Sequence, residues 1–244
     1  MVSSVYYSST AFGLFVPLAV LYSFIAKLLI RPTEQQLPPP PSQQPLPARI
    51  AIVTGSNTGV GYETAQALVN YGYVVILACR SRDKGLAAVE AIGKATTGSG
   101  GKPLFVHPLD LSDFDSIRAF CKYVSEQYPT IHVLVNNAGR NTSGKNGDLD
   151  LLFQSNFLGH FLLTSLLMDK MSADARIVNL SSVMHHFCGS CDVDSADFWK
   201  NVARYETPPT ATYNLSKLAA ILFSLELNRR YPQLCSMAVN PGAV

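Results

Sequence analysis

Tyr213 and Lys217 are the two residues of this sequence best suited to acid–base chemistry. They are four positions apart, and in a helix that spacing places both side chains on one face, one turn from each other. A free phenol has a pKa of about 10 and is a poor base at neutral pH. A neighbouring lysine ammonium favours the phenolate, so the pair predicts a group that exchanges a proton with a substrate oxygen.

A glycine-rich segment near residue 55 predicts a binding site for a pyrophosphate. The apolar run Ile50–Val53 leads into Thr54–Gly61, which reads TGSNTGVG, and a helix-forming stretch follows. Glycines at a strand-to-helix turn let backbone N–H groups approach phosphates, and the helix N-terminus favours their negative charge. Taken alone, the segment could also be a glycine-rich turn without a ligand.

The order of several motifs resembles that of the short-chain dehydrogenase/reductase family. After the TGxxxGxG element come the NNAG motif at 136–139, Asn156 in NFLGHF, Ser182 in NLSS, and the YxxxK motif that begins at Tyr213. The strings NFLGHF and SSVMHH are similar to those of retinol-dehydrogenase-type members, many of which act on lipophilic alcohols, aldehydes and ketones. The resemblance runs from residue 49 to the end of the chain.

The resemblance implies a catalytic set of Asn156, Ser182, Tyr213 and Lys217. Tyr213 would exchange a proton with the substrate oxygen while a nicotinamide exchanges a hydride with its carbon. Ser182 would hold that oxygen and stabilise charge developing on it. Ser181 is the rival, and the family's use of the second serine favours Ser182. Asn156 would position a water that relays protons from Lys217, which would also bond the nicotinamide ribose.

The resemblance also implies a dinucleotide cofactor. Arg80 follows the second expected strand, where a carboxylate would favour NAD and an arginine can pair with a 2′-phosphate. NADP(H) is therefore expected rather than NAD(H), although Arg80 could instead be a solvated strand-end residue. Arg140 departs from the family, which usually has an apolar residue there. The expected cofactor-binding residues are Gly55, Ser56, Asn57, Thr58, Gly59, Val60, Gly61, Arg80, Asp110, Leu111, Asn137, Ala138, Gly139, Tyr213, Lys217, Pro241 and Gly242.

Short β-branched runs alternate with helix-length amphipathic stretches over residues 49–244. This alternation predicts an α/β fold, a Rossmann-type doubly wound parallel sheet. The sequence stops at Val244, directly after the sixth run, so we expect the sheet to be truncated after the sixth strand and turnover to be weak. The runs are Ile50–Val53, Tyr73–Ala78, Leu104–His107, Ile131–Val135, Arg176–Leu180 and Ser236–Val239.

Residues 1–31 predict a membrane anchor. Val5–Ala26 carries no charge and is long enough for a helix that crosses the roughly 30 Å hydrocarbon layer of a bilayer. Basic residues follow this run at Lys27 and Arg31 and none precedes it, which favours an uncleaved transmembrane helix with the rest of the chain in the cytosol. Residues 32–48 are rich in proline and predict an extended linker, or alternatively an SH3 or WW ligand.

The composition of the chain excludes some classes of function and some kinds of site. The net charge is only +2, without a basic block, which excludes a nucleic-acid surface. Five cysteines, an odd number, favour free thiols in a reducing compartment. The string HHFCGSC at 185–191 is too sparse to predict a metal site, so no metal is expected.

Two functions are consistent with these patterns. One is NADP(H)-dependent interconversion of a lipophilic alcohol and its aldehyde or ketone, at the cytosolic face of the endoplasmic reticulum or a related membrane. The other is a cofactor-binding scaffold of the same fold that has lost turnover. A homodimer is left open.

The predicted anchor can be tested by cell fractionation. We expect the protein to resist extraction by carbonate and high salt, its catalytic domain to be accessible to cytosolic protease, and deletion of residues 1–31 to release it, because the uncharged run would no longer hold it in lipid. Extraction of the unmodified protein by carbonate, or protection of the domain inside sealed vesicles, would contradict the anchor or its orientation.

Overall fold

The computed structural model describes residues 49–242 except 97–99, 106, 190 and 205–207. The predicted anchor at residues 1–31 and the predicted linker at 32–48 lie outside the described residues.

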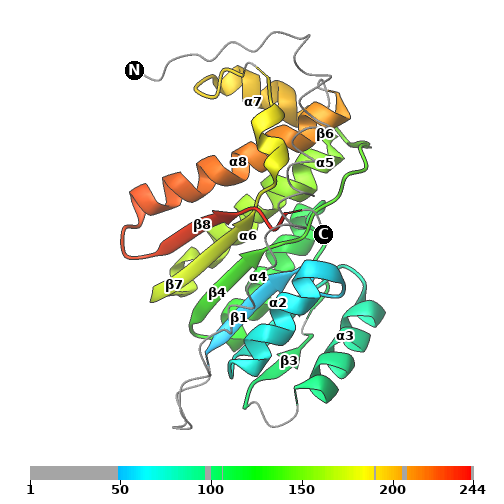
Figure 1. Ribbon diagram of the computed structural model, residues 1–244, viewed down its shortest axis with the longest axis vertical. Helices are drawn as coiled ribbons and strands as arrows, with labels where there is room; N and C mark the ends of the chain where they lie inside the picture. Colours follow the sequence, from blue (N-terminus) through cyan, green and yellow to red (C-terminus); the bar gives the residue numbers. More distant parts are fainter. Residues whose placement is uncertain (1–48, 97–99, 106, 190, 205–207, 243–244) are drawn as a thin grey trace, which may run out of the picture.

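Six parallel strands form the central sheet, in the order β3-β2-β1-β4-β7-β8 (Figure 1). The predicted parallel α/β sheet is thereby confirmed. Strand order reverses between β1 and β4, and in open α/β sheets such a reversal leaves a crevice at the carboxyl ends of the strands. The strands are β1 (Ile50–Thr54), β2 (Val74–Ala78), β3 (Lys102–Leu104), β4 (Ile131–Asn136), β7 (Met171–Leu180) and β8 (Cys235–Val239).

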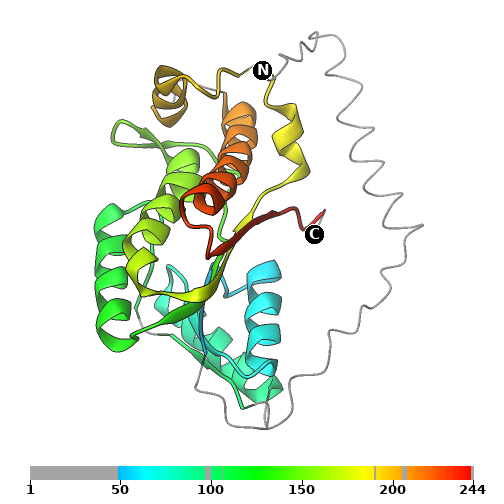
Figure 2. The same ribbon diagram turned by 90° about the vertical axis from the view of Figure 1, so that its left-hand side faces the viewer.

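Helices cover both faces of this sheet (Figure 2). Helices α2 and α3 pack on one face, and α4, α6 and α8 pack on the other. A small hairpin, β5 (Lys145–Asn146) and β6 (Leu149–Asp150), leads into the helical run that contains α6. The helices are α2 (Gly59–Asn70), α3 (Arg82–Ala95), α4 (Phe114–Gln127), α5 (Leu151–Phe153), the π-helix η1 (Gln154–Leu158), α6 (Gly159–Leu167), the 3₁₀ helices η2 (Met168–Lys170) and η3 (Val183–Phe187), α7 (Ala196–Ala203) and α8 (Pro209–Arg230).

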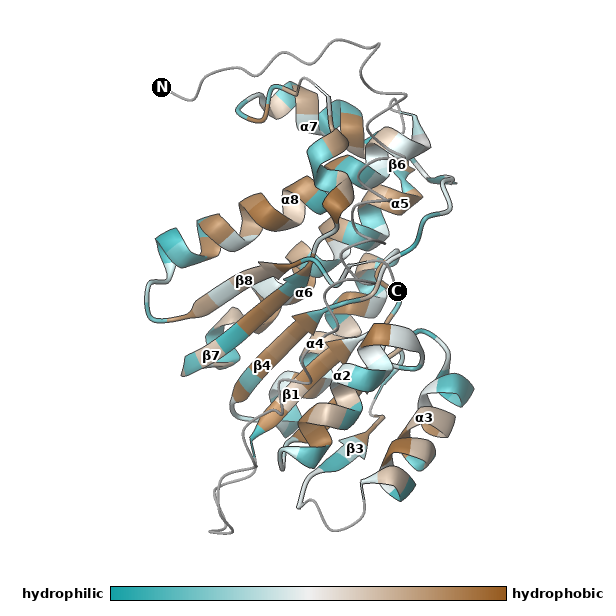
Figure 3. Cartoon of the chain, viewed as in Figure 1, coloured by the Kyte–Doolittle hydropathy of each residue, from teal (hydrophilic) through white to brown (hydrophobic). Residues whose placement is uncertain are grey.

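The alternation of side chains along the strands explains why both faces are covered. Successive strand residues point to opposite faces, so in β1 Ile52 packs with α4 and α6 while Val53 packs with α2 and α3. Every residue of β1 and β2 is buried, and the inner strands are the most continuously hydrophobic segments of the fold (Figure 3). Burial on both faces is what makes these strands read as uninterrupted apolar runs.

A row of buried, hydrogen-bonded polar side chains runs across neighbouring strands of the sheet, beside the site. The Asn136 Nδ2 group donates to Thr164 Oγ1 (3.0 Å) and to Asn179 Oδ1 (2.8 Å), and Asn179 Nδ2 donates to Ser224 Oγ (2.9 Å). These bonds link α6, β4, β7 and α8 in a single row. They fix the two helices against the sheet at one register, because an amide N–H left unpaired at this depth would be costly.

The third strand differs from its prediction. It spans Lys102–Leu104 instead of Leu104–His107, and its residues pair with β2 at the edge of the sheet. Pro103 is compatible with that position because an edge strand needs backbone N–H groups on one side only. Phe105 leaves the strand and packs beside Gly85, at a distance that leaves no room for a Cβ there.

One helical run among the described residues, Leu151–Lys170, is long and apolar enough to cross a membrane. Half of it is buried inside the fold, where α6 packs against α4. This run is therefore a core element, and its apolar character reflects contact with the sheet and with neighbouring helices.

Gly159 allows α6 to approach the loop after β3. A Cβ added at this position would lie 2.3 Å from the Leu111 carbonyl oxygen, which is part of the backbone and cannot easily move away. The loop that carries Asp110 and Leu111 is thereby held directly against the first turn of α6.

We expect Gly159→Ala to lower the free energy of unfolding by about 1–3 kcal/mol, because overpacking against backbone forces a shift of the helix. Gly93→Ala in α3 is the matched control, since a Cβ there would meet only Pro103 Cγ at 3.9 Å. That change should stabilise the protein by about 0.5–1 kcal/mol through helix propensity. Urea denaturation of both variants measures the difference, and equal stabilities would contradict the close approach at Gly159.

Candidate active site

Two adjoining cavities lie at the carboxyl ends of the strands, where the strand order reverses. The larger has a volume of about 570 Å³ and the smaller about 350 Å³. The larger is lined by Gly55, Asn57, Thr58, Val60, Gly61, Asn137, Ala138, Gly139, Arg140, Asn141, Leu180, Ser181, Tyr213, Lys217 and Pro241. The smaller is lined by Gly55, Asn57, Ala78, Cys79, Arg80, Leu109, Asp110, Leu111, Ala138, Gly139, Arg140, Thr142 and Ser155.

The glycine segment forms one wall of both cavities. Gly55 has φ +64° and Gly59 has φ +59°, backbone conformations that favour glycine. A Cβ at Gly61 would lie 2.4 Å from Asn137 Nδ2 and 2.6 Å from the Gly55 carbonyl oxygen, so only glycine fits without a shift. Helix α2 begins at Gly59, within the motif, so the N-terminal end of its dipole lies at the cavity wall. This wall can hold a phosphate.

Thr54 connects this wall to the NNAG turn after β4. Its Oγ1 accepts hydrogen bonds from the backbone N–H groups of Asn137 and Ala138, both at 2.9 Å. The Asn137 side chain in turn donates to the Thr54 carbonyl oxygen at 2.7 Å. The two loops that face the cavity are thus fixed to each other by three bonds.

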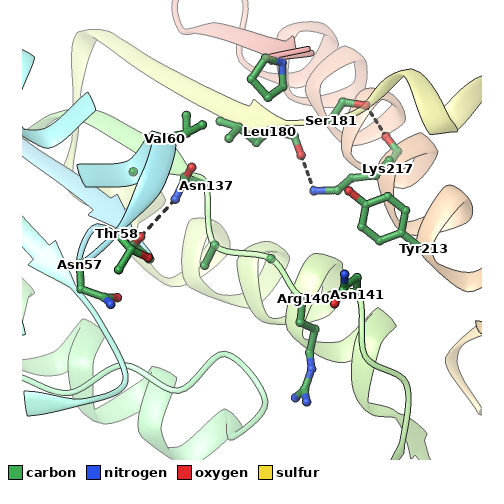
Figure 4. A pocket seen from close by; sticks show the side chains of 15 residues that line it. Asn57, Thr58, Val60, Asn137, Arg140, Asn141, Leu180, Ser181, Tyr213 and Lys217 are labelled. Atoms are coloured by element: carbon green, nitrogen blue, oxygen red, sulfur yellow. Dashed lines mark hydrogen bonds between the residues drawn. The ribbon is translucent and has the colours of Figure 1, made fainter. Parts of the chain in front are cut away.

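Tyr213 and Lys217 lie together on the first turns of α8, as predicted for a helical pair (Figure 4). The Lys217 Nζ atom is 5.6 Å from the centre of the Tyr213 ring and donates to the Leu180 carbonyl oxygen at 2.9 Å. Lys217 is buried, and this burial lowers its pKa from 10.5 to about 8. The Tyr213 side chain is half-buried and lines the larger cavity.

Asn156 lies behind the cavity, in the π-helix η1. Its Oδ1 accepts from the Arg140 backbone N–H (2.8 Å), and its Nδ2 donates to the Arg140 carbonyl oxygen (2.9 Å). Single π turns inside helices are frequent at functional sites, and this one points an amide at the strand-end turn. The side chain therefore clamps the residue after NNAG, while the water relay inferred from the sequence stays a prediction.

The two adjacent serines have different environments. Ser181 is buried, lines the larger cavity, and donates from its Oγ to the Lys217 carbonyl oxygen at 2.9 Å. Ser182 caps η3, its Oγ accepting from the Met184 backbone N–H at 3.3 Å. The Ser181 hydroxyl proton is therefore engaged, whereas Ser182 uses its hydroxyl as an acceptor. Ser182 is not among the residues that line either cavity, within the described part of the chain.

Arg80 is exposed at the end of β2 and lines the smaller cavity together with Asp110 and Arg140. The Arg140 guanidinium donates to Thr142 Oγ1 through Nε (3.2 Å) and Nη2 (3.1 Å), and its side chain points away from Tyr213 (Figure 4). Two arginines thus line one cavity, an arrangement suited to an anionic ligand.

Most of the predicted cofactor-binding residues meet at these cavities. Gly59, Gly242 and Ser56 do not line them among the described residues, and the Ser56 hydroxyl is buried, donating to the Val53 carbonyl oxygen at 2.8 Å. Thr54 and His160, two polar residues behind the cavity walls, were not predicted from the sequence. The signal was present in the strings VTG and GHF, but a threonine at a strand end and a histidine on an apolar helix are usually structural.

The cysteine-rich segment after η3 packs as an apolar element. Cys188 and Cys191 contact the cluster that contains Phe198 and Trp199 of α7, and burial raises the pKa of Cys188 to about 12. Phe198 and Trp199 are themselves partly buried against this cluster, where Trp199 stacks on Phe153 at 6.1 Å between ring centres.

Comparison with known proteins identifies the family. A family model described as short chain dehydrogenase matches residues 49–190, more than half of the chain. The protein belongs to the short-chain dehydrogenase family. Within this family it is similar to retinol dehydrogenase 11 of Mus musculus, with 42% identity over 82% of this chain and 62% of the relative. It is also 40% identical to retinol dehydrogenase 13 of Homo sapiens over 78% of this chain and 56% of that protein. The chain therefore spans less than two thirds of the length of these short-chain dehydrogenases, and the retinol-dehydrogenase-like resemblance is confirmed.

Two solved structures share the fold. An uncharacterized protein from Mycobacterium Paratuberculosis is 31% identical, with a TM-score of 0.65 over 81% of this chain and 70% of its own. The fold is also shared with the alcohol dehydrogenase of the archaeon Thermococcus sibiricus in complex with 5-hydroxy-NADP, at 22% identity and a TM-score of 0.62 over 81% and 77% of the two chains.

The lowered pKa of Lys217 predicts a pH-dependent stability. Below pH 8 the folded protein bears the cost of a buried charge. Between pH 8 and 10.5 the folded form has released its proton and the unfolded form has not, so this group raises the free energy of unfolding with pH, by about 3 kcal/mol in all.

Lys217→Met should lack this rise, because methionine carries no charge. Urea denaturation of the cofactor-free protein at several pH values measures it, with Lys122→Met on the exposed side of α4 as the control. A stability difference between the unmodified protein and Lys217→Met that stays constant up to pH 10.5 would contradict the lowered pKa.

Proposed function

We propose that this protein is an NADP(H)-dependent oxidoreductase that interconverts a lipophilic alcohol and its aldehyde or ketone. The observation that carries the proposal is the position of Tyr213 and Lys217 on the wall of the cavity that the glycine segment also lines. A proton-transfer pair and a phosphate-binding turn thus face the same space. The names of the relatives, retinol dehydrogenases, support a lipophilic alcohol as the substrate class.

The cavity walls fit a dinucleotide. The turn around Gly61 has no room for a side chain, so backbone N–H groups can approach a pyrophosphate directly. The smaller cavity would take the adenosine half, with Arg80 pairing a 2′-phosphate and Asp110 and Leu111 beside the adenine. The larger cavity would take the nicotinamide half near Lys217 and Pro241. A bound nicotinamide supplies the hydride donor or acceptor.

Within this arrangement the protein's own residues move the proton. Tyr213 gives a proton to the carbonyl oxygen during reduction, or takes it from the alcohol during oxidation. Lys217 stabilises the phenolate electrostatically at 5.6 Å from the ring centre. Its buried ammonium is held by the Leu180 carbonyl, which aims it at the cavity. Ser182 would hold the substrate oxygen after release from its cap contact with Met184.

A second candidate is a cofactor-binding scaffold without turnover. It is favoured by the position of Ser182, which caps η3 and does not line either cavity among the described residues. Binding of NADPH with no reduction of retinaldehyde, steroid or fatty aldehydes would favour the scaffold, whereas NADPH-dependent reduction of any of them favours the enzyme.

We also propose that the protein acts at a membrane, through the helix predicted in residues 1–31, with residues 49–244 forming one Rossmann domain on the cytosolic side. A lipophilic substrate would partition into the same bilayer, which supports this placement.

Tyr213→Phe should reduce kcat by about 10²- to 10⁴-fold, the usual contribution of a general acid or base. NADPH affinity should stay nearly unchanged, because the ring can still pack beside Lys217. Tyr123→Phe, on the exposed side of α4, is the matched control and should keep full activity. A Tyr213→Phe variant as active as the unmodified protein would remove Tyr213 from the mechanism.

Arg80→Asp should shift cofactor preference from NADP(H) toward NAD(H). The new carboxylate would repel a 2′-phosphate and accept bonds from the free ribose hydroxyls. The ratio of kcat/KM for NADPH and NADH measures the shift, with Arg118→Asp on the exposed side of α4 as a charge-matched control. If the unmodified protein already uses NADH better than NADPH, the assignment to Arg80 is wrong.

A further inference from the structure

His160 is a buried histidine that makes two hydrogen bonds behind the active site. It lies on α6 with 4% of its surface exposed. Its Nδ1 is 3.1 Å from the backbone carbonyl oxygen of Asn156, and its Nε2 is 2.9 Å from Thr54 Oγ1. The ring therefore joins the helix that carries the predicted catalytic asparagine to the end of β1.

The partners of the ring determine which nitrogen carries the proton. A carbonyl oxygen can only accept, so Nδ1 must hold the hydrogen and donate it to Asn156. The Thr54 oxygen already accepts from two backbone N–H groups, those of Asn137 and Ala138. Its own hydroxyl hydrogen can go to His160 Nε2 at 2.9 Å or to the Val135 carbonyl oxygen at 3.3 Å, and the shorter contact favours the ring.

These bonds complete a closed network of hydrogen bonds around the NNAG turn. Thr54 holds the turn at Asn137 and Ala138, and the Asn156 side chain holds it at Arg140 through two bonds. His160 connects these two residues, Thr54 and Asn156, to each other through its own two hydrogen bonds. Gly139, the residue between the two fixed points, lies beside Lys217 and Asn156, because a Cβ there would lie 3.7 Å from the Lys217 Nζ atom and 3.8 Å from the Asn156 Oδ1 atom.

We propose that His160 is a positioning residue that, in its neutral form, fixes the distance between Thr54 and Asn156 and thereby holds Gly139 at the active-site wall beside Lys217. The proposal rests on the proposed hydride-transfer function for its effect on turnover. The position of the turn itself can be measured without any assay of activity.

The environment of the ring is consistent with this role. Burial, with a smaller contribution from the Lys217 charge, lowers the pKa of His160 to about 4, although the bond to the Asn156 carbonyl opposes this shift. The neutral ring is needed because its Nε2 must accept the Thr54 hydroxyl hydrogen. In a protonated ring Nε2 would itself carry a hydrogen, so two donors would face each other and the Thr54 hydroxyl would have to rotate away. A buried histidine with two satisfied bonds could also serve the stability of α6 alone, so the test must separate position from stability.

The test compares His160→Phe, which keeps the ring volume and removes both bonds, with Thr54→Val, which removes the hydroxyl. Both variants and the double variant are made in the full chain. Each is assayed for kcat and KM with NADPH and retinaldehyde, for affinity to 2′,5′-ADP as a probe of the adenosine half, and for amide hydrogen exchange at Asn137 and Ala138. Thr54→Ser and His160→Asn are the conservative variants, since each retains part of the bonding.

We expect kcat to fall by about 10- to 100-fold in His160→Phe and in Thr54→Val, because a shift of the NNAG turn would misplace the reacting groups. The double variant should be no worse than the more impaired single one, because both break the same connection. Exchange at Asn137 and Ala138 should accelerate, 2′,5′-ADP affinity should be unchanged, and Thr54→Ser should restore most of the activity. If His160→Phe does not fold, His160→Asn should show a smaller loss of the same kind.

His132→Asn is the matched control, because His132 is also a partly buried histidine whose Nδ1 accepts a hydrogen bond, from the Ile50 backbone N–H at 3.1 Å, but it lies at the opposite end of β4. It should alter stability without altering kcat. Additive losses, unchanged amide exchange, or an equal loss of 2′,5′-ADP affinity would each overturn the positioning role. Absence of turnover in the unmodified protein would contradict the proposed function instead, and amide exchange would then decide the role of His160 on its own.

Discussion

The close contact between the ends of β1 and β4 is the constraint on which the site depends. The two strands are neighbours where the strand order reverses, so their loops open on the same side and meet. Gly61 has no space for a side chain because the Asn137 amide occupies it, and Thr54 uses its oxygen to hold the backbone of the second loop. The shape of the phosphate-binding wall therefore depends on residues of both loops. A side chain at Gly61 would displace the NNAG turn as well as any ligand.

The burial of Lys217 shows how the fold gives up stability at this site. An ammonium with a pKa of about 8 inside a folded protein is a cost at neutral pH. Its bond to the Leu180 carbonyl offsets part of that cost, and the Nζ atom lies 5.6 Å from the centre of the Tyr213 ring. In the proposed mechanism, the same burial that weakens the fold would strengthen the attraction between the ammonium and a phenolate, because a charge acts more strongly where water is excluded.

The sequence predicted the sheet, and the meeting of Tyr213 and Lys217 on one helix, because both depend on local patterns. Apolar runs mark strands buried on two faces, and the spacing of Tyr213 and Lys217 on α8 follows from helical geometry alone. The predicted bounds of the third strand were wrong because Leu104 and Phe105 read as one apolar run. In the structure Phe105 packs outside the sheet against Gly85. No local pattern separates these two uses of an apolar residue.

The parts of the site that the sequence did not predict are those made by long-range contacts. Thr54 and His160 are 106 positions apart, and their 2.9 Å contact depends on how α6 packs against β1. The clamp of Asn156 on the Arg140 backbone likewise depends on a π turn whose geometry no motif encodes. The two serines have different bonding for the same reason, because Ser181 reaches the carbonyl of Lys217 on another element.

The row of polar side chains across the sheet limits which substitutions its positions can accept during evolution. Asn136 donates in two directions, to Thr164 and to Asn179, and Asn179 passes the connection to Ser224. Replacing one member by an apolar residue would strand a buried amide, whereas replacing the whole row at once could be nearly neutral. In homologous chains, a replacement that removes a donor or acceptor at one of these four positions should therefore be accompanied by changes at its partners.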